Sequence, residues 1–336
     1  MDFQLFSRLS SLPAACGREE LLRDEIIKIS KPFADEITVD NVGNIIILKK
    51  GAGGKKIMLA AHMDEVSLRV KYIDDCGFLR FVQTGIDAGT LLAQRVLVQT
   101  ENHGIIPGVI GAKHAQPLSV DSLYIDIGYT KEHAAEIITI GDPVTLDRSP
   151  IEFGDGLICA KAIDDRAGVY ILLETLKTLP KNHSGDIYFV FTVQEERDSL
   201  GAQAAAFAIN PDVALIVDAT GALDVPGTPA QDIVVKTGGG VAITLADAMT
   251  ISHNGVVKHL KEICAEGNIA YQLRVSAGGG NDAVVIKRNG AGVPVGIISL
   301  PTRYMHTNVE VASKRDIDAA TALVKRFALE AGDRKY

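Results

Sequence analysis

Histidine and acidic residues follow several of the apolar segments in this chain. They are His62 and Asp64 after residues 57–61, Asp164 and Asp165 after 157–163, Glu195 and Glu196 after 187–193, Asp218 after 213–217, and His306 after 293–299 and a six-residue turn. Imidazole nitrogens and carboxylate oxygens are the protein ligands of Zn²⁺, Co²⁺ and Mn²⁺. These residue types therefore indicate a centre for divalent transition metals.

Each of these positions has a structural alternative when it is considered alone. The paired glutamates can face solvent, the paired aspartates can cap the following helix, and a lone histidine is more often a packed or surface residue. What favours a site is the shared context, because every position follows an apolar segment that is typical of a buried strand. In open α/β sheets the carboxyl ends of strands meet at one edge, and ligands bind there.

The charges of the candidate ligands favour two metal ions over one. Two divalent ions carry four positive charges, and the carboxylates of Asp164, Glu196 and Asp218 leave one, which a bridging hydroxide neutralises. With a single ion the same groups would leave an excess of negative charge in a partly dry cleft, which is costly. Two ions bridged by one aspartate form a known hydrolytic arrangement.

Two further acidic residues suit supporting roles. Asp64 lies two residues from His62, on the same side of an extended chain, and is expected to accept the other ring N–H of that histidine. Glu195 is adjacent to the ligand Glu196 but points elsewhere, and is expected to take the proton of the attacking water.

The elements that must position these residues alternate between strands and helices. The expected strands are 36–40, 44–48, 57–61, 187–193, 213–217, 270–275 and 293–299, and the expected helices are 3–9, 18–29, 165–179, 200–209, 252–266, a short one from 281 and a last one after Ser313. This alternation predicts a mostly parallel sheet with helices on both faces. Between about 66 and 160 helical periodicity is absent and short alternating segments predict a small all-β module. We therefore expect an α/β domain of 1–66 and 161–336, interrupted by a β-domain of 67–160 that overhangs the site.

Composition restricts the partners and the compartment. The chain has 336 residues, 47% of them hydrophobic, and a net charge of −8, which argues against nucleic acid or an anionic membrane as the main partner. It opens Met1-Asp2-Phe3 without a basic, apolar signal region, and no apolar run approaches the ~20 residues of a membrane span. Four widely spaced cysteines are typical of reduced thiols, so a cytoplasmic location is expected.

The motifs resemble those of a known family, the co-catalytic metallo-aminopeptidases that assemble as tetrahedral dodecamers (TET), which include glutamyl and deblocking aminopeptidases. The similar segments are AHMDE at 61–65, KAIDDRAG at 161–168, VQEE at 193–196, IVDAT at 216–220, GGGNDA at 278–283 and RYMHT at 303–307. The resemblance covers nearly the whole chain. It implies hydrolysis of N-terminal residues from peptides.

The resemblance also implies a distribution of roles. His62, Asp164 and Asp218 would bind one metal and Asp164, Glu196 and His306 the other, with Asp164 bridging. Glu195 would be the general base, and Asp64 would orient His62. The implied fold is a three-layer α/β/α, phosphorylase/hydrolase-like zinc-exopeptidase domain, with a PDZ-like or barrel-like insertion that serves dimerisation.

Some positions depart from the family pattern. Cys16 stands where Ser is common, Asn281 where Thr is common, and Arg197-Asp198 where an apolar residue and Gly are usual. No implied ligand is changed, so the departures concern substrate preference. The alternatives are a related dinuclear deacylase or carboxypeptidase, and a non-catalytic scaffold, which would lack a ligand or the base.

Overall fold

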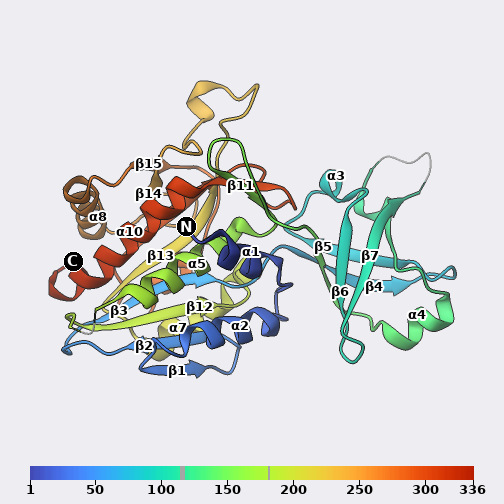
Figure 1. The fold of residues 1–336 in the computed structure, drawn as a ribbon, viewed down its shortest axis with the longest axis horizontal. Coiled ribbons are helices and arrows are strands. Elements are labelled where there is room, and N and C mark those ends of the chain that lie inside the picture. Colours follow the sequence, from blue (N-terminus) through green and yellow to red (C-terminus); the bar gives the residue numbers. More distant parts are fainter. Residues whose placement is uncertain (114–117, 181) are drawn as a thin grey trace.

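A mixed eight-stranded sheet forms the centre of the larger part of the molecule (Figure 1). The computed structural model describes residues 1–113, 118–180 and 182–336. The strand order is β1 (Glu36–Val39), β2 (Ile45–Lys49), β12 (Asp186–Thr192), β3 (Lys56–His62), β13 (Val213–Gly221), β16 (Val295–Thr302), β14 (Val241–Ala246) and β15 (Tyr271–Val275). The four central strands β12, β3, β13 and β16 run parallel. Their carboxyl ends therefore lie at one edge.

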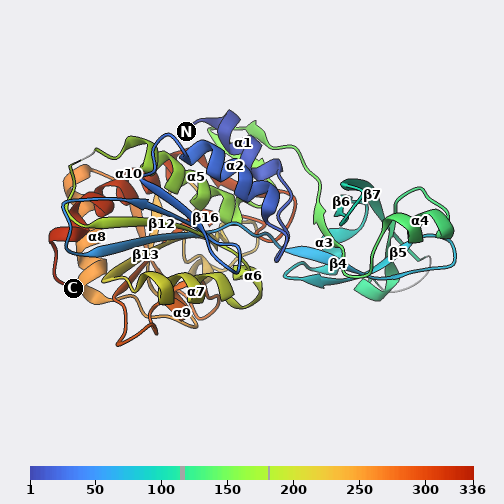
Figure 2. The same cartoon turned by 90° about the horizontal axis from the view of Figure 1, so that it is seen from below.

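Helices pack on both faces of this sheet (Figure 2). One face is covered by α1 (Phe3–Ser11), α2 (Glu20–Ser30), α5 (Ile163–Thr178), α8 (Asn254–Gly267) and α10 (Lys314–Glu330), and the other by α7 (Leu200–Ile209) and α9 (Ala283–Ile286). Successive strand residues point to opposite faces, and in β3 Ile57 and Leu59 join the first core while Met58 and Ala60 join the second. Burial on both faces explains why the central strands read as continuous apolar runs.

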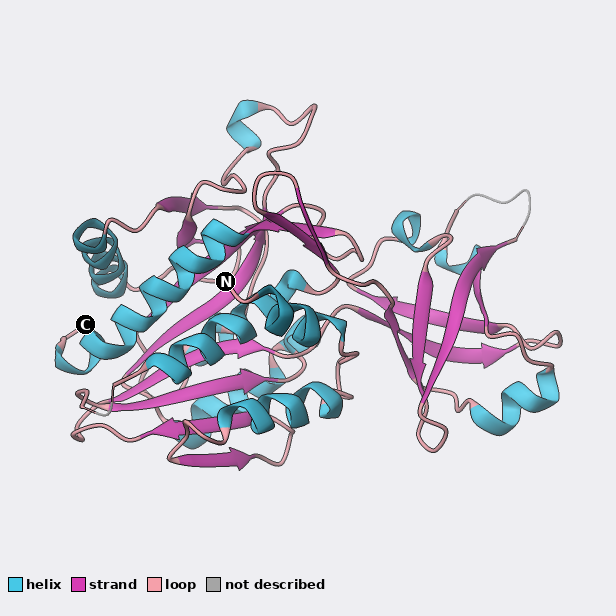
Figure 3. Cartoon of the chain, viewed as in Figure 1, coloured by secondary structure: helices cyan, strands magenta, loops and turns pink. Residues whose placement is uncertain are grey.

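The inserted module is a closed barrel with its own hydrophobic core, and Figure 3 shows its strands as a group apart from the sheet. Around the barrel the order is β4 (Ser67–Ile73), β5 (Leu79–Thr84), β8 (Leu123–Asp126), β7 (Ile105–Ala112), β6 (Arg95–Gln99) and β9 (Pro143–Leu146). It also contains α3 (Ala88–Leu91), α4 (Lys131–Ile137) and the 3₁₀ turn η1 (Val120–Ser122). These helices are short, which explains why residues 66–160 show no helical periodicity in the sequence. The expected α/β fold with an inserted β-module is confirmed.

A separate three-stranded sheet corrects one expectation about the site. β10 (Ile151–Phe153), β11 (Leu157–Ala160) and β17 (Glu310–Ser313) pair antiparallel, outside the main sheet. The segment 157–163 was expected to end at the edge of the main sheet, and this is wrong. A short apolar run does not reveal its pairing partner. The barrel strands themselves end at Leu146, so β10 and β11 lie with the larger part of the chain.

The remaining elements are short. They are α6 (Glu195–Asp198) and the 3₁₀ turns η2 (Ala230–Asp232) and η3 (Ala331–Asp333). Strands β14 and β17 and helix α6 were not expected from the sequence. Among the described helices, none combines the length and the apolar character that crossing a bilayer requires.

Candidate metal centre

The predicted ligands come from four different elements and one loop, and they meet at the carboxyl edge of the main sheet. His62 is the last residue of β3, and Glu195 and Glu196 begin α6 directly after β12. Asp218 lies inside β13, which continues to Gly221, and not beyond its end as expected. Asp164 belongs to the first turn of α5, and His306 lies in the loop between β16 and β17. The five residues converge, but only three of them lie at or after a strand end of the main sheet. They are His62 at the end of β3, Glu196 after β12 and His306 after β16.

The carboxylate of Asp164 lies between two imidazoles. Its Oδ1 is 3.1 Å from Nε2 of His62, and its Oδ2 is 3.3 Å from Nε2 of His306. Asp218 Oδ1 is 3.7 Å from the same nitrogen of His62, and Glu196 Oε1 is 3.4 Å from Nε2 of His306. The five residues thus form two groups that share Asp164.

In its neutral form, each imidazole presents a nitrogen without a hydrogen to these acids. Nδ1 of His62 lies 3.1 Å from the backbone carbonyl of Asp64, and Nδ1 of His306 lies 3.0 Å from the carbonyl of Gly85. A carbonyl only accepts hydrogen bonds, so in the neutral ring Nδ1 carries the hydrogen and Nε2 keeps its lone pair. Lone pairs that face carboxylate oxygens repel each other unless a cation or a proton lies between them. Gly85 follows β5, so the barrel helps to orient His306.

The pKa values of the buried groups also show that the site favours positive charge. Burial raises the pKa values of Glu196 and Glu310 to about 8 and that of Asp282 to about 7. Burial alone would lower the pKa of His306, but Asp164 and Glu196 outweigh it and raise this pKa to about 9. The acids around His62 likewise raise its pKa despite desolvation. A cluster that attracts protons so strongly also suits divalent cations.

One buried oxygen supports this fit directly. Oε1 of Glu196 has no hydrogen-bond partner among the described residues although it is buried, and such an orphaned acceptor costs free energy unless an ion or water satisfies it. Among the residues that the structure describes, two sets of potential ligand atoms lie close enough to one another to hold an ion. They are His62, Asp164 and Glu196, and His62, Asp165 and Asp218. The donor set is that of a transition-metal site.

Asp165 was not among the predicted ligands. Its Oδ1 accepts the N–H of Gly168 and its Oδ2 accepts the N–H of His62 at 3.2 Å. The carboxylate is therefore occupied in joining α5 to the end of β3. This role is structural, and helix capping by the pair Asp164-Asp165 was the structural alternative that the sequence left open.

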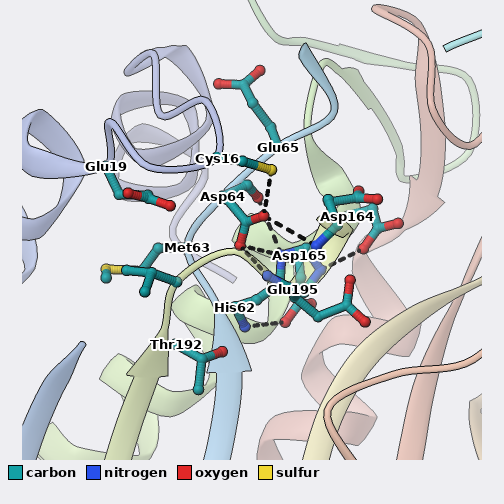
Figure 4. A network of polar contacts seen from close by, with 12 residues as sticks. Cys16, Glu19, His62, Met63, Asp64, Glu65, Asp164, Asp165, Thr192 and Glu195 are labelled. Carbon is teal, nitrogen blue, oxygen red and sulfur yellow. Dashed lines mark hydrogen bonds and ion pairs between the residues drawn. The ribbon is translucent and has the colours of Figure 1, made fainter. Parts of the chain in front are cut away.

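Asp64 makes a different contact from the one expected. The hydrogen bond of the His62 ring goes to the Asp64 carbonyl, while the Asp64 carboxylate is 3.6 Å from the ring. That carboxylate instead accepts the backbone N–H groups of Glu195 at 2.9 Å and Glu196 at 3.1 Å, and the thiol of Cys16 donates to it at 3.0 Å (Figure 4). Asp64 therefore fixes the main chain of both glutamates.

Two residues with a positioning role were missed from the sequence. Glu310 is buried in β17, and its two oxygens accept the N–H of His306 at 2.7 Å and of Asp164 at 3.0 Å. Asp282 accepts the hydroxyl of Thr192 at 2.6 Å at the end of β12. An acidic residue four positions after His306 was the available signal for Glu310, but without β17 its direction was unknown.

Lys161 and Arg166, two basic residues near the site, are engaged elsewhere. Lys161 and Arg166 both pair with the buried Glu65, at 2.7 and 3.1 Å. Arg166 also donates to the carbonyl of Met63. They tie the start of α5 to the segment after β3 and do not contact the ligand oxygens. Arg197 and Asp198, which depart from the family pattern, are exposed.

Comparison with known proteins gives consistent matches along the chain. Residues 43–323 match the family described as M42 glutamyl aminopeptidase. The chain is 32% identical over 348 residues to the lysyl aminopeptidase of Pyrococcus furiosus, covering 98% of this chain and 97% of that protein. Its structure is similar to an aminopeptidase from the archaeon Desulfurococcus kamchatkensis, with a TM-score of 0.94 and 41% identity over 97% of this chain and 94% of the other. It is also similar to the TET1 peptidase of Pyrococcus horikoshii, with a TM-score of 0.88 and 32% identity over 98% and 99% of the two chains, and that peptidase can assemble into a tetrahedron or a large octahedral shell.

Proposed function

The chain belongs to the M42 glutamyl aminopeptidase family and is a metal-dependent aminopeptidase, and from this premise we propose that five residues hold two divalent cations. His62, Asp164 and Asp218 hold one ion, and Asp164, Glu196 and His306 hold the other. The observation that carries this proposal is the Asp164 carboxylate, whose two oxygens face the Nε2 atoms of two different imidazoles. Zn²⁺ and Co²⁺ suit this mixture of nitrogen and oxygen ligands best, with Mn²⁺ as a third candidate.

Different residues of the chain then have different roles in peptide hydrolysis. Divalent ions bound here would polarise the first carbonyl of the peptide as Lewis acids. The Glu195 carboxylate accepts the proton of the attacking water and returns it to the leaving amine. Burial raises the pKa of Glu195 well above its usual value, which makes it a stronger base. Asp64 holds the Glu195 backbone at 2.9 Å and so keeps the base in place.

A substitution of the base tests this assignment. Glu195→Gln removes the proton acceptor but no proposed ligand, so hydrolysis of Leu-p-nitroanilide should fall by about 10²–10⁴-fold while the metal content, measured by elemental analysis, stays at two ions per subunit. Glu132→Gln on the exposed face of α4 is the matched control and should leave both quantities unchanged. Near-normal turnover by Glu195→Gln would remove this role from Glu195.

The class of substrate requires a separate experiment. Peptides with a free N-terminus, N-acylated peptides and peptides with a blocked C-terminus distinguish an aminopeptidase from a deacylase or a carboxypeptidase that uses the same metal ligands. We expect cleavage of the free-amine and C-terminally blocked peptides. Cleavage of the N-acylated peptides alone would favour the deacylase.

We also propose that the inserted domain, expected over residues 67–160 and with barrel strands that run from β4 to β9, is PDZ-like or barrel-like in kind and serves self-association beside a three-layer catalytic domain, expected over 1–66 and 161–336. The tetrahedral assembly of the P. horikoshii peptidase supports self-association, and the assembly that we propose is a dimer that builds a dodecamer. The barrel also exposes large apolar side chains such as Tyr72 on β4 and Val82 on β5, which favours burial against another subunit.

A further inference from the structure

The turn of residues 15–18, between α1 and α2, is fastened to the chain segment that follows β3. The N–H of Glu65 donates to the carbonyl of Ala14 at 3.0 Å, and the Glu65 carboxylate accepts the N–H of Ala14 at 3.0 Å. These two contacts hold the start of the turn against the segment that contains Asp64. Cys16, the second residue of the turn, therefore lies beside Asp64.

The thiol of Cys16 donates a hydrogen bond to Oδ2 of Asp64 at 3.0 Å (Figure 4). Burial raises the pKa of this thiol and the Asp64 carboxylate raises it further, so the sulfur keeps its hydrogen and acts as a donor. The same carboxylate accepts the backbone N–H groups of Glu195 at 2.9 Å and Glu196 at 3.1 Å. A donor on Oδ2 helps to fix the direction of the carboxylate, and this direction sets the place of both glutamate backbones.

Two side chains of the barrel bind the same turn. Nη2 of Arg69 on β4 donates to the carbonyl of Cys16, and Nη1 of Arg69 donates to the carbonyl of Gly141 at 3.0 Å. Gln99 of β6 donates to the carbonyl of Arg18 at 3.3 Å. A guanidinium carries its N–H donors in one rigid plane. Arg69 therefore fixes the distance between the barrel loop before β9 and the residue whose thiol holds the site.

We propose that Arg69, Cys16 and Asp64 form a positioning chain that connects the barrel to the general base. Arg69 holds the carbonyl of Cys16, and the thiol of Cys16 holds the Asp64 carboxylate. Asp64 in turn holds the backbone of Glu195. Arg69 and Cys16 are positioning residues, because they act on the base only through Asp64. The inference rests on the proposed function, in which Glu195 is the base.

Steady-state hydrolysis of Leu-p-nitroanilide by the metal-loaded enzyme tests the thiol. Cys16→Ala removes the donor and should lower kcat about tenfold, the lower end of the effect of losing a contact outside the metal ligands. KM should stay within about twofold of the wild-type value, because the contact orients the base for the transition state and does not bind substrate. Cys16→Ser keeps a hydrogen-bond donor and should recover most of kcat. Cys264→Ala, which removes a buried thiol from α8, is the matched control and should keep the wild-type kcat.

Arg69→Met tests the connection to the barrel and leaves the thiol in place, so it decides the question even if Cys16→Ala fails to fold. It should lower kcat at an unchanged KM. The double variant that combines it with Cys16→Ala should lose little more than the stronger single variant, because residues in one hydrogen-bond network are not additive. Arg80→Met is the matched control and should keep the wild-type kcat, since Arg80 is also half-buried but donates to the Leu123 carbonyl within the barrel, at 2.8 Å.

Three results would overturn the positioning chain. They are a wild-type kcat in Cys16→Ala or in Arg69→Met, equal losses in Cys16→Ser and Cys16→Ala, and fully additive losses in the double variant. Glu195→Gln in the same assay separates these results from the proposed function. A near-normal kcat in Glu195→Gln contradicts the proposed base, whereas a strongly reduced kcat there beside a normal one in Cys16→Ala overturns the positioning chain alone.

Discussion

At the scale of single residues, Glu310 links two ligands that are far apart in sequence. One oxygen holds the backbone of Asp164 and the other that of His306. Burial raises the pKa of its carboxyl to about 8, but both of its contacts come from N–H donors, which only an acceptor can satisfy. Glu310 therefore fixes the spacing of Asp164 and His306 without touching either side chain.

Glu310→Gln should weaken metal binding. The amide group places an N–H donor against one of the two backbone N–H groups, so either Asp164 or His306 must shift. Loss of such an outer contact typically lowers metal affinity about 10–100-fold. Titration of the metal-free protein with Zn²⁺ in a calorimeter measures this directly. Glu152→Gln in the same small sheet, where the side chain is exposed and pairs with Lys314, is the control. Equal affinities for both variants would show that Glu310 has no positioning role.

The residue types at the centre could be predicted from the sequence, but several contacts could not. His62, Asp164, Glu196, Asp218 and His306 were selected because imidazoles and carboxylates follow apolar strands, and the structure brings all five together. The contact of Asp64 depended on where α6 begins. A side chain two residues from His62 can reach the ring or the neighbouring strand end, and spacing alone does not distinguish these directions.

At the scale of elements, the strands that could be predicted from the sequence are those with long apolar runs buried on both faces. The central strands were found because both of their faces are buried, so that their apolar runs are uninterrupted. β17 was missed because its four residues, Glu310–Ser313, combine a charged and a polar residue with two apolar ones. Its burial is complete only because β11 and the metal ligands surround it, which is a property of the tertiary structure.

The contact of α8 with α10 predicts a pH-dependent stability. His259 of α8 is buried, with Nε2 3.0 Å from Glu330 and Nδ1 2.8 Å from the hydroxyl of Tyr336. Desolvation lowers the pKa of His259 below its usual value, although Glu330 opposes this. Below pH ~6.5 the unfolded chain therefore binds a proton at this residue more readily than the folded chain. The stabilisation is present above that pH and is lost as the pH falls toward the folded pKa.

The melting temperature of the metal-loaded protein at pH 7.5 and pH 5.5 measures this effect. His259→Gln cannot titrate, so its Tm should fall less between the two pH values than that of the wild type, by on the order of 1 °C for a chain of this size. His103→Gln, at an exposed position, should behave like the wild type. If His259→Gln and the wild type lost the same number of degrees, the contact between α8 and α10 would not be the source.

At the scale of the whole molecule, the barrel is coupled to the site and yet stands apart from the main sheet. It has its own core, and Figure 1 shows it as a separate lobe joined through β4 and the segment before β10. Its Gly85 carbonyl nevertheless fixes the ring of His306 at 3.0 Å. Movement of the barrel relative to the sheet would therefore change the direction of a proposed metal ligand. Contacts between the barrels of an assembly could therefore affect the site through the orientation of His306.

A charge on the barrel surface tests whether this lobe holds subunits together. Tyr72 and Val82 lie on the neighbouring strands β4 and β5 and are 53% and 47% exposed. Val82→Asp costs the isolated barrel little because the side chain faces solvent, but in an apolar contact it buries an unpaired carboxylate, which is strongly unfavourable. We therefore expect a smaller assembly by size-exclusion chromatography with light scattering. Phe207→Asp, at a position 81% exposed on α7, should leave the molar mass unchanged, because α7 packs against the main sheet, apart from the barrel (Figure 2). If Phe207→Asp dissociates the assembly and Val82→Asp does not, the subunit contact lies on the helical face, and the barrel then serves the site only by orienting His306.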